Sequence, residues 1–146
     1  MPKRRRTVFV LSSQSVIRAL VSYRLQLLGF APVCAESEID FNDKLGNCSP
    51  AIFLIDLDST TYDGMQLIEK LSSDEATSQI PVLCMSAEGD LVSAERAFRA
   101  GAKDFLVVPF DPIVLEEKTV KLIELFKAQA QQKDRQSQAP LAMAQI

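Results

Sequence analysis

Two acidic residues, Asp56 and Asp58, directly follow the apolar run from Ile52 to Ile55. A carboxylate at the end of a buried strand is costly unless a cation or hydrogen bonds compensate its charge, so this placement often marks a functional site. Such a carboxylate can accept a phosphoryl group or bind a metal ion. Alternatively, Asp56 begins a turn by accepting hydrogen bonds from nearby backbone amides.

The chain of 146 residues contains no histidine. This absence excludes Ser-His-Asp and Cys-His nucleophile pairs, an imidazole general base and a zinc site with histidine ligands. A phosphohistidine carrier is excluded for the same reason. Any chemistry must therefore use carboxylates, hydroxyls, thiols or lysines.

The cysteines and the apolar segments indicate the compartment. Cys34, Cys48 and Cys84 are isolated, which indicates neither a disulfide framework nor a paired-cysteine metal site. The first apolar stretch stops at Ser12 and is too short for a signal peptide, and no segment approaches the length of a membrane span. We expect a cytoplasmic protein.

Charge is distributed unevenly along the chain. The net charge is −3, and Lys3, Arg4, Arg5 and Arg6 carry four positive charges, which leaves −7 for residues 7–146. An acidic body repels phosphate backbones, which argues against nucleic acid as a partner. We expect residues 1–6 to form a solvated basic extension, although they could also contact RNA, an anionic lipid surface or an acidic protein.

Short apolar runs alternate five times with amphipathic stretches. The predicted strands are Thr7–Leu11, Phe30–Ala35, Ala51–Ile55, Pro81–Met85 and Phe105–Val108. Several are continuous rather than alternating, which is typical of strands buried on both faces of a parallel sheet.

Five helices are predicted between and after these strands. The first is capped by Ser15, buries Ile17, Leu20, Val21 and Leu28, and stops at Gly29. The others span Ile39–Leu45, a stretch after Gly64 that aligns Met65, Ile68 and Leu71, the range Leu91–Ala100 that stacks Leu91, Ala94 and Phe98, and a last helix that begins at Pro112 with Asp111 as cap.

This alternation predicts an α/β fold: a flavodoxin-like (βα)5 domain with a doubly wound, five-stranded parallel sheet of strand order 2-1-3-4-5. The domain should cover residues 7–127, followed by a flexible Gln/Ala-rich tail at 128–146 whose apolar residues could form a docking peptide. Functional residues of such folds lie in loops at the carboxyl ends of the strands, here 12–15, 56–64, 86–90 and 108–112.

The string from Asp56 to Thr60 resembles the first motif of haloacid dehalogenase phosphatases. That resemblance implies Asp56 as nucleophile and Asp58 as general acid/base, with Ser86 as a later hydroxyl. It covers only this short motif, Lys103 is poorly placed for the family lysine, and no acidic pair follows the next strand.

A second resemblance covers Thr7 to Phe126. Its landmarks are Gly29, Pro50, Asp56, Gly64 eight residues later, Ile80–Ala87, Gly101–Phe105 and Val107–Phe110. In this order and spacing the chain resembles the receiver domain of bacterial two-component response regulators, of the chemotaxis-regulator type. The resemblance implies that Asp56 is the phospho-acceptor position and that Ser86 and Phe105 are switch positions. Pro109 matches a proline whose preceding peptide bond is typically cis in that family.

Three positions depart from the family pattern. Two acids that join the acceptor in holding Mg²⁺ are Ser12 and Ser13 here, and the lysine that pairs with the phosphoryl group is Val108. A hydroxyl binds Mg²⁺ more weakly than a carboxylate does, and losing one charge-stabilising contact costs about 2.7–4 kcal/mol. We therefore expect inefficient phosphorylation. Asp58, if it is not simply a solvated loop residue, could with Asp56 supply weak metal affinity.

These observations predict an atypical single-domain receiver, a pseudo-receiver, in phosphorelay signalling. It is expected to be no enzyme, to need no cofactor beyond weakly bound Mg²⁺, and to act by binding proteins. The expected face comprises the fourth helix, fifth strand and fifth helix, and its expected partners are a histidine kinase, a downstream effector or a second copy. The residues expected on it are Arg96, Arg99, Lys103, Glu116, Glu117, Lys121 and exposed Val114. The alternatives are a phosphorylatable receiver with an unconventional metal shell and a small aspartate-based phosphatase.

Overall fold

The computed structural model describes the backbone of residues 5–144 and the side chains of residues 5–132. The strands are β1 (Thr7–Leu11), β2 (Ala31–Ala35), β3 (Ile52–Asp56), β4 (Val82–Ser86) and β5 (Asp104–Val107). The helices are α1 (Ser15–Leu27), α2 (Glu38–Leu45), α3 (Gly64–Ser73), α4 (Leu91–Ala100) and α5 (Pro112–Ala144). The alternation of strand and helix expected from the sequence is confirmed.

The five strands form one parallel sheet in the order β2-β1-β3-β4-β5, as predicted. The register pairs Val10 of β1 with Leu54 of β3, and Asp56 at the end of β3 with Met85 of β4. All five residues of β3 and of β4 are buried, because helices cover both faces of the sheet. Asp56 is therefore placed at the carboxyl edge of the central strand.

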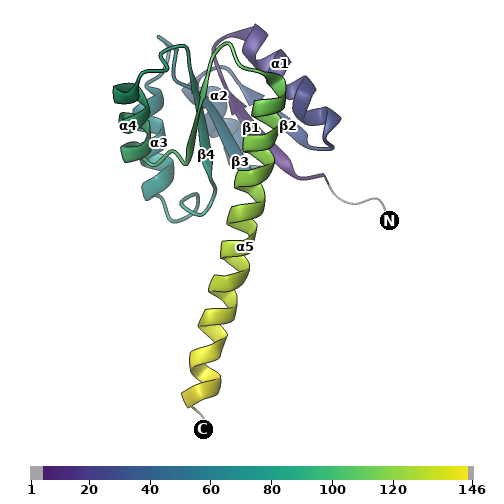
Figure 1. Cartoon of the computed structure of the whole chain (residues 1–146), viewed down its shortest axis with the longest axis vertical. Helices are drawn as coiled ribbons and strands as arrows, with labels where there is room; N and C mark the ends of the chain where they lie inside the picture. The colour runs from purple at the N-terminus through teal and green to yellow at the C-terminus, as the bar shows by residue number, and fades with distance from the viewer. Residues whose placement is uncertain (1–4, 145–146) are drawn as a thin grey trace.

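Two apolar layers hold the helices on the sheet. One layer joins β1, β3 and β4 to α2, α3 and α4, and the other joins the same strands to α1 and α5. Figure 1 shows α5 crossing in front of the strands, α1 at their upper right, and α3 and α4 at their left. The two layers follow from strand geometry, because successive side chains point to opposite faces.

Three phenylalanines centre the layer beneath α2. The ring of Phe41 lies 4.8 Å from that of Phe9 and 5.8 Å from that of Phe53, between ring centroids, at tilted angles favourable for aromatic pairs. All three side chains are essentially inaccessible to solvent. This cluster anchors α2 to the middle of the sheet.

Local side chains fix where the helices begin and end. The carboxylates of Asp63 and Asp90 accept hydrogen bonds from Gln66 N and Ser93 N at the starts of α3 and α4. The predicted cap at Ser15 is wrong: Gln14 is the cap residue of α1, without a side-chain capping bond. Gly101 ends α4 with φ 127° in contact with Ser72, a position where a Cβ would collide.

Several side chains expected in the core lie outside it. Leu20 and Leu28 are 38% and 45% exposed, because α1 faces the sheet through Ile17, Val21 and Leu25 instead. The expected burial of Leu91 and Phe98 in α4 is also wrong, because these side chains are 83% and 47% exposed. The small residues Ala97 and Ala100 make the buried contacts of α4 instead.

The start of α5 also differs in detail from the expectation. Val114, expected to be exposed, is half-buried against the layer of α1 and α5, and its neighbour Ile113 is exposed. The helix continues to Ala144 and projects beyond the sheet in Figure 1, past residue 127, where the sequence analysis ended the domain. The flexibility of residues 128–146 stays a prediction. The apolar residues of the expected docking peptide, Leu141, Met143 and Ile146, lie outside the described side chains.

Among the described residues, no helix combines the length and the apolar character that a membrane crossing requires.

The aromatic cluster should dominate the stability of this side of the domain. Phe41→Ala is expected to lower the free energy of unfolding by about 3–5 kcal/mol, because it removes a buried ring and leaves a cavity. Urea denaturation measures the change. Ile39→Ala on the same helix is the matched control, since Ile39 is 76% exposed, and it should change stability by no more than about 0.5 kcal/mol. Equal losses in both variants would contradict the assignment of Phe41 to the core.

Candidate functional site

The site lies where β1, β3 and β4 end at the same edge of the sheet. Asp56 is the last residue of β3, Ser12 follows β1, and Ser86 is the last residue of β4. Asp56 is 1% exposed, and Ser12 and Ser86 are also buried. The topology thus brings together three residues that the sequence analysis singled out.

The carboxylate of Asp56 is held by neutral hydrogen-bond donors. Its Oδ2 accepts from Ser12 Oγ at 2.7 Å and from Gln14 Nε2 at 3.2 Å, and its Oδ1 accepts from the backbone N of Asp58 at 2.9 Å. Hydrogen bonds of this kind offset part of the cost of burying a charge. Gln14 was not identified as a site residue from the sequence, although it lies in the loop 12–15 expected to be functional.

The loop after β1 is itself fixed by further contacts of Ser12. The Oγ of Ser12 accepts from the backbone N of Gln14 at 3.1 Å, and Arg18 Nη1 donates to the carbonyl of Ser12 at 2.6 Å. Ser13, which the sequence placed beside Ser12 in the acid pocket, is half-buried and forms no hydrogen bond to Asp56 within the described part of the chain. Only one of the two serines therefore contacts the acceptor position.

The side-chain carboxylate of Asp58 contacts the end of β4, whereas only the backbone N of Asp58 bonds to Asp56. Its Oδ1 accepts from Ser86 Oγ at 2.7 Å, and its Oδ2 accepts from the backbone N of Ala87 at 2.6 Å. The same Ser86 Oγ also accepts from the backbone N of Glu88 at 3.0 Å. We call this set of bonds the Asp58 latch, because one carboxylate joins the β3–α3 loop to the β4–α4 loop.

Tyr62 is buried beside the site and contacts the backbone of Asp56. Its hydroxyl donates to the carbonyl oxygen of Asp56 at 2.6 Å and lies 3.4 Å from that of Leu11. Burial raises the pKa of Tyr62 well above its usual range, and the nearby charge of Asp56 adds to this shift. The phenol therefore stays protonated and acts as a donor. Sequence reasoning missed this residue, and its only signal was its place in the loop 56–64.

The positions after β4 and β5 supply no cation. Val108 is half-buried against the core layer of α1 and α5, and its backbone N donates to the carbonyl of Ser86 at 2.8 Å. The peptide bond between Val108 and Pro109 is cis. Phe105 is half-buried and packs against the opposite layer, beneath α3 and α4.

The residues present do not form a magnesium site of the receiver type. Mg²⁺ requires several oxygen ligands in octahedral geometry, and neutral hydroxyls stand where carboxylates would be needed. The two carboxylates of the site, Asp56 and Asp58, are each engaged with protein donors. Within residues 5–132, no three histidine, cysteine, aspartate or glutamate side chains are grouped to hold a metal ion.

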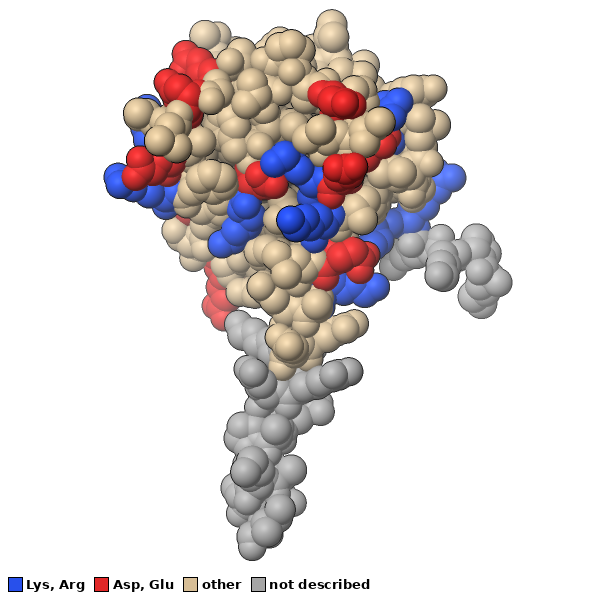
Figure 2. All heavy atoms as spheres, viewed as in Figure 1, with Lys and Arg blue, Asp and Glu red and all other residues tan. Residues whose placement is uncertain are grey.

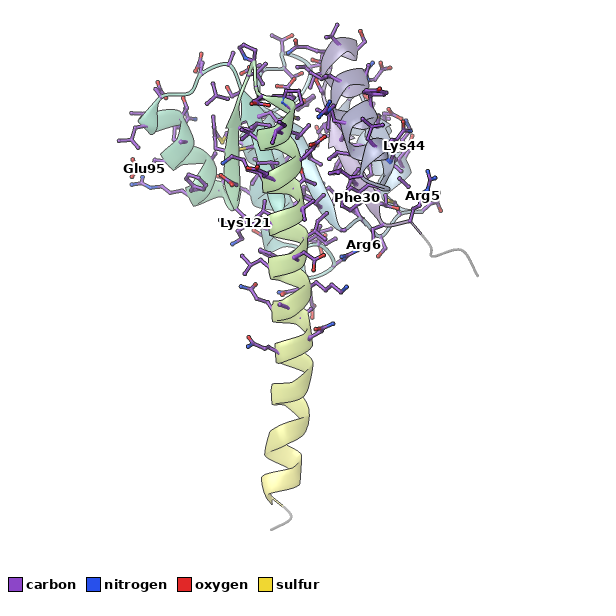
Figure 3. All side chains as sticks on the ribbon, turned by 45° about the vertical axis from the view of Figure 1, so that its right-hand side comes forward. Arg5, Arg6, Phe30, Lys44, Glu95 and Lys121 are labelled. Carbon is purple, nitrogen blue, oxygen red and sulfur yellow. The ribbon has the colours of Figure 1, made fainter. Side chains whose placement is uncertain are left out.

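Grooves lie on both ends of the sheet. Beside the Asp58 latch, a groove of about 510 Å³ is lined by residues that include Asp58, Ser86 and Arg96. A larger groove, of about 910 Å³, lies at the opposite end near the starts of β1 and β3, with Arg5, Arg6, Lys44 and acidic neighbours on its walls. Figure 3 labels these three basic side chains near the entry of the chain into β1. Residues 1–4 of the basic extension lie outside the described residues.

A cysteine nucleophile is not part of this site. Burial raises the pKa of Cys84 to about 12, and its thiol donates to the carbonyl of Asp104 at 3.4 Å. Burial also raises the pKa of Cys48. Because the thiolate is the reactive form, neither group is activated at neutral pH. The chemistry open to the site is that of carboxylates and hydroxyls.

The fold and the placement of Asp56 at the edge of β3 define the class of protein. The family model of the response regulator receiver domain matches residues 8–120. The chain therefore belongs to the response regulator receiver family, whose members are signalling modules of two-component pathways.

Individual relatives agree with this assignment. The chain is 29% identical over 113 residues to the chemotaxis protein CheY1 of Helicobacter pylori. This alignment covers 76% of the chain and 91% of CheY1. It is 31% identical over 107 residues to the phosphate regulon transcriptional regulatory protein PhoB of Escherichia coli, covering 73% of this chain but 47% of PhoB. The structure of chemotaxis response regulator CheY4 of Vibrio cholerae superposes with a TM-score of 0.75 at 19% identity, over 82% of this chain and 99% of that one.

The bond from Ser12 to Asp56 should contribute measurably to stability. Ser12→Ala is expected to lower the free energy of unfolding at neutral pH by about 1.5–3 kcal/mol, because it removes a buried hydrogen bond to a charged group. Chemical denaturation measures the loss. Ser13→Ala is the adjacent control and should cost no more than about 0.5 kcal/mol. A loss confined to Ser13→Ala would show that the contacts of Asp56 are misassigned.

Proposed function

We propose that this chain is an atypical receiver, a pseudo-receiver, which works in the cytoplasm as a protein–protein interaction module of a two-component pathway. In this proposal Asp56 is phosphorylated weakly or not at all, and the chain is not an enzyme. The supporting observation is that the polar groups of the site are already paired with one another.

The pairing of Asp56 opposes its phosphorylation. Both carboxylate oxygens accept hydrogen bonds from the protein, and the bonds from Ser12 and from the backbone of Asp58 withdraw charge from the oxygen that would attack. No lysine stands at position 108 to offset the developing charge of a phosphoryl group. Each missing contact of this kind costs about 2.7–4 kcal/mol in the transition state.

In the Asp58 latch, the carboxylate of Asp58 bonds to the groups that a phosphoryl group on Asp56 would otherwise engage. Ser86 is a switch position of the resemblance, and its hydroxyl together with the amide of Ala87 is bound by Asp58. The β4–α4 loop is then held by a permanent carboxylate, independently of Asp56. This arrangement favours a module with one constitutive binding conformation.

The face formed by α4, β5 and α5 suits protein partners. Its exposed apolar residues include Leu91, Val92, Phe98, Val107 and Ile113, and its exposed charged residues include Glu95, Arg96, Arg99, Lys103, Glu117 and Lys121. Glu116, also expected on this face, is instead half-buried and paired with Arg24 of α1. Figure 3 labels Glu95 on α4 and Lys121 on α5. Mixed apolar and charged surfaces of this kind are typical of protein interfaces. A histidine kinase or a downstream effector is the proposed partner.

The first test is labelling with acetyl phosphate in the presence of Mg²⁺. The wild-type chain is expected to incorporate no more phosphate than Asp56→Asn. A variant with Ser12→Asp, Ser13→Asp and Val108→Lys should gain labelling that depends on Mg²⁺, because these changes supply the missing carboxylates and the missing cation. Intact-protein mass spectrometry detects the added phosphoryl group.

Two other results would change the assignment. Mg²⁺-dependent labelling of wild type at Asp56 would establish a phosphorylatable receiver with an unconventional metal shell. Hydrolysis of an aryl phosphate by wild type, lost in Asp56→Asn, would establish an aspartate-based phosphatase.

A second test addresses the Asp58 latch directly. Asp58→Ala removes the acceptor of the Ala87 amide, so hydrogen exchange at residues 87–90 should accelerate about tenfold for each 1.4 kcal/mol of lost local stability. Asp63→Ala is the matched control, because Asp63 caps α3 and should affect exchange there instead. Unchanged exchange at residues 87–90 in Asp58→Ala would contradict the latch.

A further inference from the structure

Helix α1 carries apolar side chains on two faces, of which the fold covers only one. Ile17, Val21 and Leu25 are buried against the sheet. The uncovered residues Val16, Leu20, Tyr23 and Leu27 are 74%, 38%, 60% and 61% exposed. Their spacings of four, three and four residues place them on one stripe of an α-helix, which we call the α1 stripe.

Few charges lie around the α1 stripe, and the charged side chains of α1 are paired, Arg18 with the exposed Glu36 at 3.6 Å. The other exposed residues from Gln14 to Gly29 are Gln14, Ser15, Ala19, Gln26, Leu28 and Gly29. The two arginines of α1 are half-buried and engaged within the domain: Arg18 bonds to the carbonyl of Ser12, and Arg24 pairs with Glu116 at 2.9 Å. In Figure 2 the upper right of the molecule, where Figure 1 places α1, is tan with a few red and blue side chains, and more charged side chains lie lower, over α5 and its neighbours.

We propose that the α1 stripe is the contact surface of a homodimer, in which two copies pack their α1 helices antiparallel about a two-fold axis. The spacing of four, three and four is the same in both directions along the helix. A two-fold axis therefore places Val16 against Leu27 of the second copy, and Leu20 against Tyr23 of the second copy. This self-complementarity is what a symmetric contact between identical chains requires.

Charge favours a second copy at this surface. In the same register Arg24 faces Ala19 of the second copy, so like charges do not oppose each other across the contact. Elsewhere the copies repel, because residues 7–146 carry a net charge of −7. An uncharged helix face is where two acidic domains can approach at the least electrostatic cost.

The size of the α1 stripe sets the expected strength of the dimer. Four partly exposed side chains present a few hundred Å² per copy, below the ~800 Å² per partner of a standard interface. The dimer should therefore form at micromolar concentrations or above. It leaves the face of α4, β5 and α5 free, whereas the sequence analysis placed a homodimer on that face.

Sedimentation velocity of the full chain tests the proposal over a concentration series from about 5 to about 500 μM. The weight-average mass of wild type should rise toward that of a dimer. Tyr23→Glu should weaken the dissociation constant at least about tenfold, since it places a charge at the centre of the contact. Leu91→Glu, on exposed α4, is the matched control and should dimerise as wild type does. Circular dichroism and urea denaturation establish that both variants are folded.

Cross-linking tests the register. Val16→Cys and Leu27→Cys are made separately in a background of Cys34→Ala and Cys48→Ala, and the two variants are then mixed and oxidised. The mixed disulfide between positions 16 and 27 should predominate over both symmetric ones.

Three results would overturn the proposal. The first is a wild-type chain that stays monomeric throughout the series, which would leave the α1 stripe to a different protein. The second is a dimer that Leu91→Glu abolishes and Tyr23→Glu spares, which would place the contact on α4. The third is a predominance of the symmetric disulfide between two copies of position 16, which would show a parallel arrangement.

Discussion

Burial of the Asp56 carboxylate is the constraint on which the site depends. Its position at the end of β3 is fixed by five consecutive buried residues, so the charge cannot move into solvent without disrupting the central strand. A buried carboxylate must find donors or a cation. In this chain the donors are a serine, a glutamine side chain and a backbone amide, and Tyr62 fixes the carbonyl of the same residue. The loops after β1 and β3 are thereby tied to one another without a cation.

Because Asp56 is surrounded by neutral donors and no cation, the carboxylate of Asp58 is more stable when it points away from Asp56. Two carboxylates close together without a cation repel each other, and Asp58 instead reaches the hydroxyl and amide at the end of β4. Its backbone still donates to Asp56, so a single loop serves both acids with different atoms. The replacement of acids by serines and the presence of Asp58 are thus parts of one arrangement.

The strands were predictable because apolar runs bounded by turn residues specify a parallel sheet, and the sheet in turn specifies which loops meet. The order of residues along the chain is therefore enough to place Asp56, Ser12 and Ser86 at one edge of the sheet. It is not enough to place the side chain of Asp58, because a loop carboxylate selects among donors only after the neighbouring loops are positioned. Gln14 and Tyr62 were missed for the same reason. Leu20 and Leu28 were assigned to the core because helical periodicity identifies apolar positions but does not distinguish a covered face from an uncovered one.

The two exposed apolar regions of the domain differ in charge, and this difference assigns them different occupants. The face of α4, β5 and α5 surrounds its apolar side chains with arginines, lysines and glutamates, which select a partner by complementary charge. The α1 stripe itself carries no charged side chain, and its symmetric spacing is complementary to the same stripe on a second copy. If the domain acts by binding, its selective face must stay accessible, and the proposed self-association through the α1 stripe leaves that face uncovered. Because the proposed dimer contact is small, the dimer forms only at high protein concentration, and the amount of the protein then sets how many selective faces are presented together.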